Sequence, residues 1–362
     1  MQSFRLADSE IQLSRIIFGC WAMGGWFWGG SRDADSIRAV HAALDAGVSS
    51  FDTAPVYGFG HSETILGQAI HDRRDRVVIA TKFGLRWNEK SFPANNKVSD
   101  SEVATDARPA FSIQAHNSGL GCDHPLHNQD FSVYHNLRAE SIIQECEDSL
   151  RRLQTDYIDL YQVHWPDDPA RRDWSEVQKA LIRLREAGKI RAAGVSNFTV
   201  ENMESWRKSG SVPIAADQEK YNLLHHKPER GNIPYLRKRG IPLLAYSPLA
   251  QGLLTGKRIN TEDLPEDDWR RRRSLFADEI QDKIQDASRK LKEIRVRYEI
   301  TDAGLALAFL LHAEGVGGVI CGMRNPDQLR ENIRAASIAL QQTDQAEIAN
   351  IWMETGVRDN QH

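Results

Sequence analysis

The sequence predicts an α/β protein folded as a (β/α)8 TIM barrel. Short apolar runs alternate with longer segments whose apolar residues recur at helical spacing, and eight such strand–helix units follow one another. The predicted strands are apolar at every position, which is typical of strands buried on both faces in a parallel sheet. A doubly wound sheet would normally carry a GxGxxG phosphate turn after its first strand, and the stretch FGCWAMGG does not match that pattern.

The local patterns also place the individual elements. An N-terminal β-hairpin is expected from Phe4–Leu6 and Ile11–Leu13, which are joined by ADSE. Barrel strands are expected at residues 16–19, 49–51, 77–80, 157–164, 190–195, 214–218, 242–246 and 316–321. Helices are expected at residues 33–46, 61–71, 141–153, 174–188, 199–210, 228–239, 278–298, 302–313, 326–336 and 343–354.

A long insertion, residues 85–137, interrupts this alternation after the third strand. Because it follows a strand end, it is expected to emerge over the catalytic face of the barrel. Polar loops of this length without secondary structure are usually functional or disordered, so the insertion is a candidate substrate lid or oligomer arm. Its histidines and cysteine are expected to be solvated rather than zinc ligands, because CDHPLH is not an established zinc spacing. These residues are His116, Cys122, His124, His127 and His135.

Composition narrows the class of protein. The 362 residues suit a single barrel domain over residues 1–362 that includes the insertion. The formal net charge of −4 is nearly balanced, so neither a nucleic acid nor an anionic membrane is expected as a partner. The four cysteines form no CxxC pair, and the N-terminus shows no secretory signal. The apolar run 16–30 is too short and glycine-rich for a membrane span, and a cytoplasmic protein is predicted.

Polar side chains gather at the predicted strand ends, which share one face of a barrel. Four of them are titratable groups of different kinds, Asp52, Tyr57, Lys82 and His164. Each one alone has a plausible structural explanation, such as a capped turn or a solvated lysine. Ionisable groups are rarely gathered on one rim without use, so their convergence predicts an active site.

These groups suit proton transfer. A tyrosine hydroxyl titrates near pH ~10, which is too high for an effective acid at neutral pH. An ammonium about 4 Å away contributes about 4 kcal/mol at an effective dielectric of ~20, so Lys82 is expected to lower the pKa of Tyr57 by roughly two to three pH units. Asp52 would keep Lys82 charged, and His164 would orient a substrate oxygen by a hydrogen bond. Acyl transfer is not favoured, because no serine or cysteine with its own base is evident.

Two stretches near the C-terminal end of the sequence predict phosphate sites. Asn325, Pro326 and Asp327 read as the N-cap and first turn of a helix, with Arg324 just before it. Exposed amides beside a guanidinium bind phosphate well. The stretch SPLAQGLLTGK offers further backbone amides and the ammonium of Lys257 for a second phosphate.

Six long motifs occur in register along the chain, and together they indicate a family. They are FDTAPVYGFGHSETILG, TKFG, SLRRLQTDYIDLYQVHWPD, GVSNF, YSPLAQGLLTGK and GMRNPDQLREN. In this order they resemble the successive signatures of the aldo-keto reductase superfamily over nearly the whole length. The tryptophan-rich stretch after the first strand looks most like the bacterial branch that acts on small carbonyls, sugars or cyclitols.

The resemblance implies an oxidoreductase that binds NADPH in extended form and uses a catalytic tetrad. The tetrad positions match Asp52, Tyr57, Lys82 and His164, with Tyr57 as the proton donor in carbonyl reduction. Cofactor contacts are implied for Trp21, Asp52, Ser196, Asn197, Gln218, Tyr246, Ser247, Pro248, Leu249, Gln251, Gly252, Lys257, Gly322, Arg324, Gln328, Glu331 and Asn332. An aromatic-walled substrate pocket is implied for Trp21, Trp26, Trp28, Tyr57, Trp87, His164 and Trp165.

The sequence departs from the family pattern at one cofactor position. The position that often carries a lysine beside the 2′-phosphate looks like Gly322 here, so Arg324 is expected to take that role. NADPH is favoured, and NADH stays possible. The run Arg270 to Arg273 is expected to be a solvated loop rather than a phosphate contact.

The function expected from the sequence is the interconversion of a carbonyl (aldehyde, ketone, sugar or cyclitol) and its alcohol by hydride transfer. The alternative is a cofactor-sensing regulatory subunit with little turnover, because binding partners within the superfamily can retain the tetrad. The expected partner is a small carbonyl or sugar substrate, and a homo-oligomer is possible.

Overall fold

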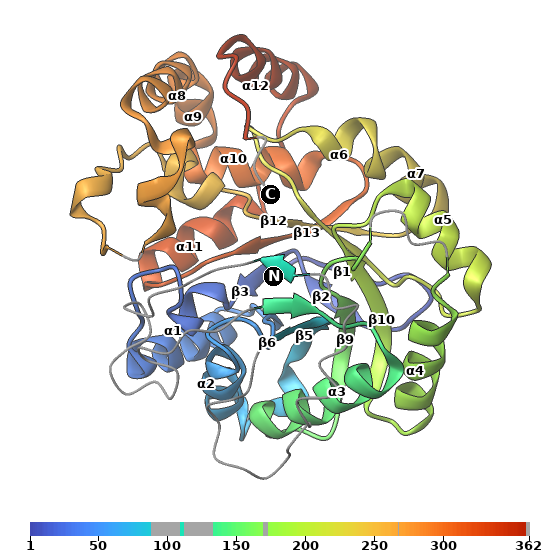
Figure 1. Ribbon diagram of the computed structural model, residues 1–362. Helices are drawn as coiled ribbons and strands as arrows, with labels where there is room; N and C mark the ends of the chain where they lie inside the picture. Colours follow the sequence, from blue (N-terminus) through green and yellow to red (C-terminus); the bar gives the residue numbers. More distant parts are fainter. Residues whose placement is uncertain (88–108, 112–132, 169–172, 267, 360–362) are drawn as a thin grey trace.

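The computed structural model describes residues 1–87, 109–111, 133–168, 173–266 and 268–359, and it confirms the predicted barrel. Eight parallel strands close on themselves and are surrounded by helices (Figure 1). In barrel order they are β3 (Ile16–Gly19), β4 (Ser50–Asp52), β5 (Val78–Phe83), β9 (Ile158–Val163), β10 (Ile190–Ser196), β11 (Asp217–Lys220), β12 (Leu243–Tyr246) and β13 (Val316–Cys321). The barrel closes where β13 pairs with β3, for example Ile320 with Ile17.

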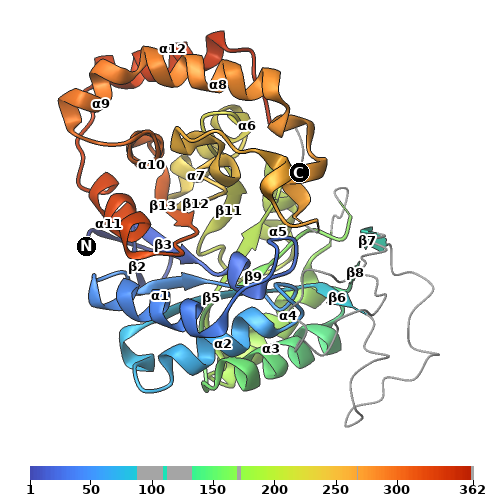
Figure 2. The same cartoon turned by 90° about the vertical axis from the view of Figure 1, so that its left-hand side faces the viewer.

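The predicted hairpin is present and closes the amino-terminal end of the barrel. It consists of β1 (Ser3–Arg5) and β2 (Gln12–Ser14), with Phe4 opposite Leu13. Its Leu6 and Leu13 are buried in one cluster with the inward-facing side chains of the barrel strands. The hairpin and the sheet formed by β6, β7 and β8 lie at opposite ends of the barrel (Figure 2).

The helices follow the predicted order with two interruptions. The helices are α1 (Asp33–Asp45), α2 (His61–Ile70), α3 (Ala139–Leu153), α4 (Ser175–Glu186), α5 (Val200–Ser209), α6 (Lys227–Arg230), α7 (Asn232–Arg239), α8 (Asp278–Lys290), α9 (Lys292–Tyr298), α10 (Asp302–His312), α11 (Pro326–Ala335) and α12 (Gln342–Glu354). The helix predicted at 278–298 is divided at Leu291, whose ψ of 6° leaves the helical range. The one predicted at 228–239 is divided at Gly231. None of the described helices is long and apolar enough to cross a membrane.

One predicted strand is shifted. The run 214–218 was expected to be a strand, but ladder pairing of β11 begins only at Asp217. Residues 215 and 216 still bond to β10, because the amide of Ala215 donates to the carbonyl oxygen of Ala193 (2.8 Å) and the amide of Val195 donates to that of Ala216 (3.1 Å). The carbonyl oxygen of Ala215 also accepts a hydrogen bond from the amide of Ala7, just after the hairpin strand β1, so the hairpin is joined to the barrel at this end.

The insertion is structured where it leaves the barrel, which corrects the expectation of a loop without secondary structure. Its described parts form an antiparallel sheet of β6 (Leu85–Trp87), β8 (Val133–His135) and β7 (Pro109–Phe111). Leu85 pairs with His135, so the two ends of the insertion lie side by side. The predicted solvated residues His116, Cys122, His124 and His127 lie outside the described residues.

Glu145 on α3 fixes the turn between the barrel strand β5 and the insertion strand β6. Its carboxylate accepts hydrogen bonds from the amide of Gly84 (3.0 Å) and the hydroxyl of Ser141 (3.2 Å). Gly84 has φ +94°, and a Cβ there would lie 2.4 Å from Leu137, so only glycine fits. Burial raises the pKa of Glu145 to about 7, since it outweighs the favourable interactions with Arg86 and Gly84.

This raised pKa predicts a pH-dependent stability. A carboxyl whose pKa rises on folding stabilises the native state below its ordinary value of 4.5, and the contribution is lost as the pH rises through about 7. Glu145→Gln removes the titration. The free energy of unfolding of the wild type relative to this variant is therefore expected to fall by up to about 3 kcal/mol between pH ~4.5 and ~7.5. Urea unfolding across this range measures it.

Glu147→Gln is the matched control, because Glu147 lies on the same helix but is half-exposed and pairs with Lys189. The free energy of unfolding of the Glu147→Gln variant is expected to change with pH in the same way as that of the wild type. Parallel curves for Glu145→Gln and the wild type would contradict the prediction.

Candidate active site

Lys82, at the end of β5, is the centre of the predicted tetrad. Its ammonium is 2.6 Å from Asp52 Oδ1, 2.9 Å from the carbonyl oxygen of Thr53 and 3.2 Å from the hydroxyl of Tyr57. Lys82 is fully buried and Asp52 is 2% exposed. Burial disfavours the ammonium, but Asp52 and Tyr57 outweigh that cost and raise the pKa of Lys82. The side chain is therefore a permanent cation in the barrel mouth.

Tyr57 lies in the loop between β4 and α2, and close backbone packing holds it there. A Cβ on Gly24 would lie 2.5 Å from the carbonyl carbon of Tyr57, and one on Gly58 (φ +62°) would lie 2.1 Å from the carbonyl oxygen of Gly24. Two glycines thus allow the loop after β3 to pack directly on the loop that carries Tyr57.

The pKa of Tyr57 differs from the prediction. Lys82 was expected to lower it well below its ordinary value of 10, and the Lys82 ammonium does act in that direction. Burial acts more strongly in the other direction, with a smaller contribution from Asp52, so the pKa of Tyr57 is raised overall. In this environment the hydroxyl is held protonated, as a proton donor requires.

His164 follows β9 and completes the group. Its ring stands edge-on to that of Tyr57, with the ring centroids 5.9 Å apart. Burial, and then the nearby Lys82 and His135, lower the pKa of His164 well below its ordinary range. The imidazole is therefore neutral, with one ring N–H that can donate a hydrogen bond.

Four of the predicted cofactor contacts, Ser196, Asn197, Gln218 and Tyr246, form one hydrogen-bonded network with the tetrad. Gln218 Nε2 donates to Asp52 Oδ2 (2.8 Å), and Ser196 Oγ donates to the Gln218 carbonyl oxygen (2.8 Å). Asn197 Nδ2 donates to the carbonyl oxygen of His164 (3.0 Å), and the hydroxyl of Tyr246 donates to Asn197 Oδ1 (2.9 Å). Strands β10, β11 and β12 thus bring their polar ends to the same rim as Lys82.

The predicted aromatic residues divide into two groups. The ring of Trp21 stacks on that of Tyr57 at a centroid distance of 6.0 Å. The ring of Trp28 meets the Trp21 ring edge-on, at a centroid distance of 5.3 Å. Trp26 and Trp87 are 8% and 6% exposed and pack in a cluster with Phe59, against which Tyr57 and Trp165 rest. Trp21 is therefore in direct contact with the tetrad, whereas Trp26 and Trp87 support the wall from behind.

The stretch after β12 bends through residues with unusual backbone angles. Ser247, Ala250 and Gln251 all have positive φ, and Gly252 has φ +106°. These turns keep the segment irregular and close to the barrel mouth, with Pro248 buried and Leu249 half-buried. Lys257 is exposed.

The predicted helix start beside Arg324 is confirmed, with Asn325 Oδ1 accepting from the Gln328 amide (3.0 Å) and Pro326 in the first turn. A Cβ added at Gly322 would have no other atom within 4 Å. The guanidinium of Arg324 is 5.6 Å from the ring of Trp28. Glu331 follows on the same helix.

Asn332 is the most informative residue of this helix. It is 2% exposed, and its Nδ2 has no hydrogen-bond partner among the described residues. A buried donor without an acceptor is costly, so a ligand that supplied an acceptor here would be stabilised.

The arginine run 270–273 is the expected solvated loop only in part, because Arg271 and Arg272 are exposed whereas Arg270 and Arg273 pair with buried carboxylates. Arg270 forms two hydrogen bonds with the buried Asp268, and Arg273 is 7% exposed and donates to Asp359 (2.9 Å). Trp269, in the same segment, packs 5.6 Å from Trp21. Sequence reasoning missed Trp269, Lys220 and Asp359; only the mixture of acids and aromatics in DDWRRRRS distinguishes this run from a free basic loop.

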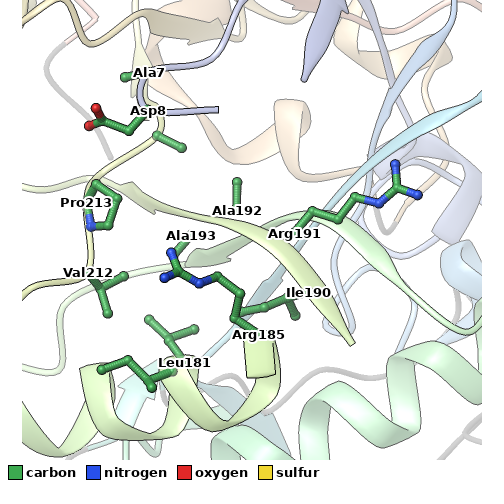
Figure 3. A pocket seen from close by; sticks show the side chains of 12 residues that line it. Ala7, Asp8, Leu181, Arg185, Ile190, Arg191, Ala192, Ala193, Val212 and Pro213 are labelled. Carbon is green, nitrogen blue, oxygen red and sulfur yellow. The ribbon is translucent and has the colours of Figure 1, made fainter. Parts of the chain in front are cut away.

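Two hollows in the surface of the described residues differ in size and position. A groove of about 820 Å³ runs between α1 and the start of α11, with Met23, Ala39 and Leu329 among its apolar lining and Arg324 on its edge. A second pocket, of about 20 Å³, lies at the other end of the barrel between Asp8 and Arg185 (Figure 3). It has room for about one water molecule and is far from Tyr57, so it is not the substrate site.

Comparison with known proteins gives consistent results. The model of the Aldo/keto reductase family matches residues 15–353. The aldo-keto reductase YhdN of Bacillus subtilis is 36% identical over 358 residues, which cover 98% of this chain and 95% of that protein. The NADH-specific methylglyoxal reductase of Escherichia coli is 34% identical over 348 residues, with coverage of 95% and 96%. The structure of the glycerol dehydrogenase AKR11B4 from Gluconobacter oxydans superposes with a TM-score of 0.78 at 31% identity, covering 99% of this chain and 98% of that one.

The buried ion pair predicts a large stability effect at Asp52. Asp52→Asn leaves the ammonium of Lys82 buried without a carboxylate, which is expected to lower the free energy of unfolding by about 3 kcal/mol. Asp45→Asn, at an exposed aspartate 3.8 Å from Arg73, should cost less than about 0.5 kcal/mol. Urea denaturation of the two variants tests this. Equal small losses would mean that the Lys82 site tolerates the missing charge.

Proposed function

The chain belongs to the aldo/keto reductase family, and from this premise we propose that it is an NAD(P)H-dependent oxidoreductase of small carbonyl compounds and the corresponding alcohols. The observation that carries the proposal is the buried group at the barrel mouth, in which Tyr57 is hydrogen-bonded to the Lys82–Asp52 ion pair. A protonated phenol beside a permanent cation is suited to give a proton to a carbonyl oxygen on which negative charge develops.

Each residue of the tetrad has a distinct role in this proposal. A bound nicotinamide supplies the hydride in reduction and accepts it in oxidation. Tyr57 delivers the proton to the carbonyl oxygen, and Lys82, 3.2 Å away, stabilises the phenolate that remains. A unit charge at about 4 Å contributes about 4 kcal/mol at an effective dielectric of ~20. Neutral His164 donates a hydrogen bond that orients the substrate oxygen, and Asp52 keeps Lys82 charged and in place.

The cofactor would be held along the rim from Tyr246 to Asn332. Ser196, Asn197 and Gln218 offer amide and hydroxyl groups beside Tyr246 for the carboxamide end. The irregular backbone from Ser247 to Gly252, with Gln251 and Lys257, would hold the pyrophosphate. Arg324 and the helix start at Asn325 would hold the 2′-phosphate. Asn332 Nδ2, which has no partner in the part of the chain that the structure describes, supports an adenosine end at α11.

The substrate is proposed to be a small carbonyl or polyhydroxy compound. Trp21 stacks on Tyr57, and such an aromatic wall suits the apolar faces of sugars, cyclitols and small aldehydes alike. The similar proteins named for methylglyoxal reduction and glycerol oxidation favour small, oxygen-rich substrates and both reaction directions. Trp165 and the described base of the insertion would border this pocket.

The Tyr57→Phe variant tests the proposal most directly. It keeps the ring against Trp21 but removes the transferable proton, so turnover is expected to fall by about 10²- to 10⁴-fold while NAD(P)H binding persists. Consumption of NADPH and NADH against aldehydes, keto sugars and inosose-type ketones measures turnover, with the reverse reaction run on the matching alcohols. Wild-type turnover in this variant would refute the role of Tyr57. Tight cofactor binding without turnover in the wild type would favour a sensing protein.

Arg324→Ala tests how the cofactors are distinguished. The dissociation constant for NADPH is expected to rise by about 10- to 100-fold, because a charge-assisted contact to phosphate is lost, while that for NADH changes by less than about threefold. Arg330→Ala is the matched control, since Arg330 is a nearby arginine on α11 whose guanidinium pairs with Asp327. An equal rise in the dissociation constants for NADPH and NADH would exclude Arg324 as the 2′-phosphate contact.

A further inference from the structure

A buried carboxylate from the segment after α12 lies between two buried cations. Asp359 Oδ2 is 2.6 Å from the ammonium of Lys220, and its Oδ1 accepts from the guanidinium of Arg273 (2.9 Å). The side chains of Lys220, Arg273 and Asp359 are 6%, 5% and 2% exposed. The three residues come from β11, from the loop after β12 and from the segment that follows the last helix.

The backbone of Asp359 is anchored on both sides of its side chain. Its amide donates to the carbonyl oxygen of Leu224 (2.8 Å), and its carbonyl oxygen lies 2.5 Å from His225 Nδ1. These backbone contacts place the carboxylate between Lys220 and Arg273.

Arg273 connects Asp359 to the part of the barrel rim that is assigned to the cofactor. Its Nη1 donates to Gln251 Oε1 (2.8 Å), and its guanidinium lies 4.5 Å from the centre of the Trp269 ring. The Trp269 ring in turn packs against Trp21, and the amide of Trp269 donates to the carbonyl oxygen of Phe27 (3.4 Å). The segment 268–273 thus runs from the turn after β12 to the tryptophan-rich loop after β3, across the rim assigned to the cofactor.

We propose that Asp359 is a positioning residue for the cofactor: by holding Arg273, it keeps segment 268–273 in place across the rim between Gln251 and Trp21 and slows release of NAD(P)H. This inference rests on the proposed function, because it assumes that the rim binds the cofactor. Asp359 itself lies behind the rim, against Arg273 and Lys220, and acts through Gln251 and Trp269.

The charges explain why a carboxylate is required there. Lys220 and Arg273 repel each other in a site with little water, and burial and Arg273 lower the pKa of Lys220 while Asp359 opposes them. Removing one partner of a buried charge pair leaves the other uncompensated, which is strongly unfavourable. Without the carboxylate, Arg273 is expected to turn towards solvent and to release Gln251 and Trp269 with it.

Release of NADPH from preformed complexes tests the inference, with tryptophan and nicotinamide fluorescence followed by stopped flow. The rate for Asp359→Asn is expected to be about tenfold that of the wild type, which corresponds to about 1.4 kcal/mol. The KM for the cofactor should rise in parallel while kcat is maintained. Asp344→Asn is the matched control, because Asp344 is a buried aspartate on α12 that pairs with Arg297 and Tyr298 away from the rim. Its release rate should equal that of the wild type.

Two further variants separate positioning from simple stability. Lys220→Met keeps the contact between Asp359 and Arg273 and should release NADPH at the wild-type rate. The double variant Lys220→Met/Asp359→Leu restores the wild-type net charge of the cluster, so its Tm should recover, yet its release should stay fast because leucine, unlike asparagine, offers Arg273 no acceptor. If Asp359→Asn alone fails to fold, the release rate of the double variant still tests the positioning role.

The outcomes distinguish the two proposals. Unchanged release in Asp359→Asn, or release that returns to the wild-type rate together with Tm in the double variant, would overturn the positioning role while leaving the proposed function intact. A wild-type protein that binds neither NADPH nor NADH would refute the proposed function and the inference together.

Discussion

The ion pair between Lys82 and Asp52 is the constraint on which the rest of the site depends. A buried ammonium is costly unless its hydrogen-bonding capacity is met, and Lys82 meets it with one carboxylate, one carbonyl oxygen and one phenol. Those acceptors come from β4 and the loop that follows it, whereas Lys82 comes from β5. The pairing therefore fixes the loop carrying Tyr57 against the neighbouring strand. Gln218 extends the restraint across the barrel, because it donates to the second oxygen of Asp52.

The buried barrel mouth has a low effective dielectric, and this has two effects on Tyr57, His164 and Lys82. It keeps Tyr57 protonated and His164 neutral, because burial penalises the charged form of each. It also strengthens every interaction that a developing charge makes with Lys82 and with the donors around it. A carbonyl oxygen that gains negative charge is thus met by one cation and neutral donors already in position. Under the proposed function, this arrangement gives the burial of polar groups in the barrel mouth a catalytic use.

The sequence predicts the framework well because its signals are local. Apolar runs and helical spacing place the barrel strands and the start of α11, and the position of Lys82 at a strand end follows from its neighbours alone. The pKa of Tyr57 could not be predicted, because it depends on how deeply the folded protein buries the ring. The divisions at Leu291 and Gly231 escape a periodicity argument, since the apolar pattern continues through both. Asp359 was missed for a different reason: its partner Arg273 is 86 residues away, and only the fold brings them together.

Antiparallel pairing of β6 with β8 joins the two ends of the insertion where they meet the barrel. Leu85 and His135 are cross-strand partners, and the amide of Asn136 donates to the carbonyl oxygen of Gly84 (3.1 Å), so the chain leaves and re-enters the barrel at one point. A segment whose ends are already joined adds little loop-closure cost when it lengthens or shortens. The insertion can therefore change in length at little cost to the barrel, while Lys82, two residues before Gly84, keeps its place.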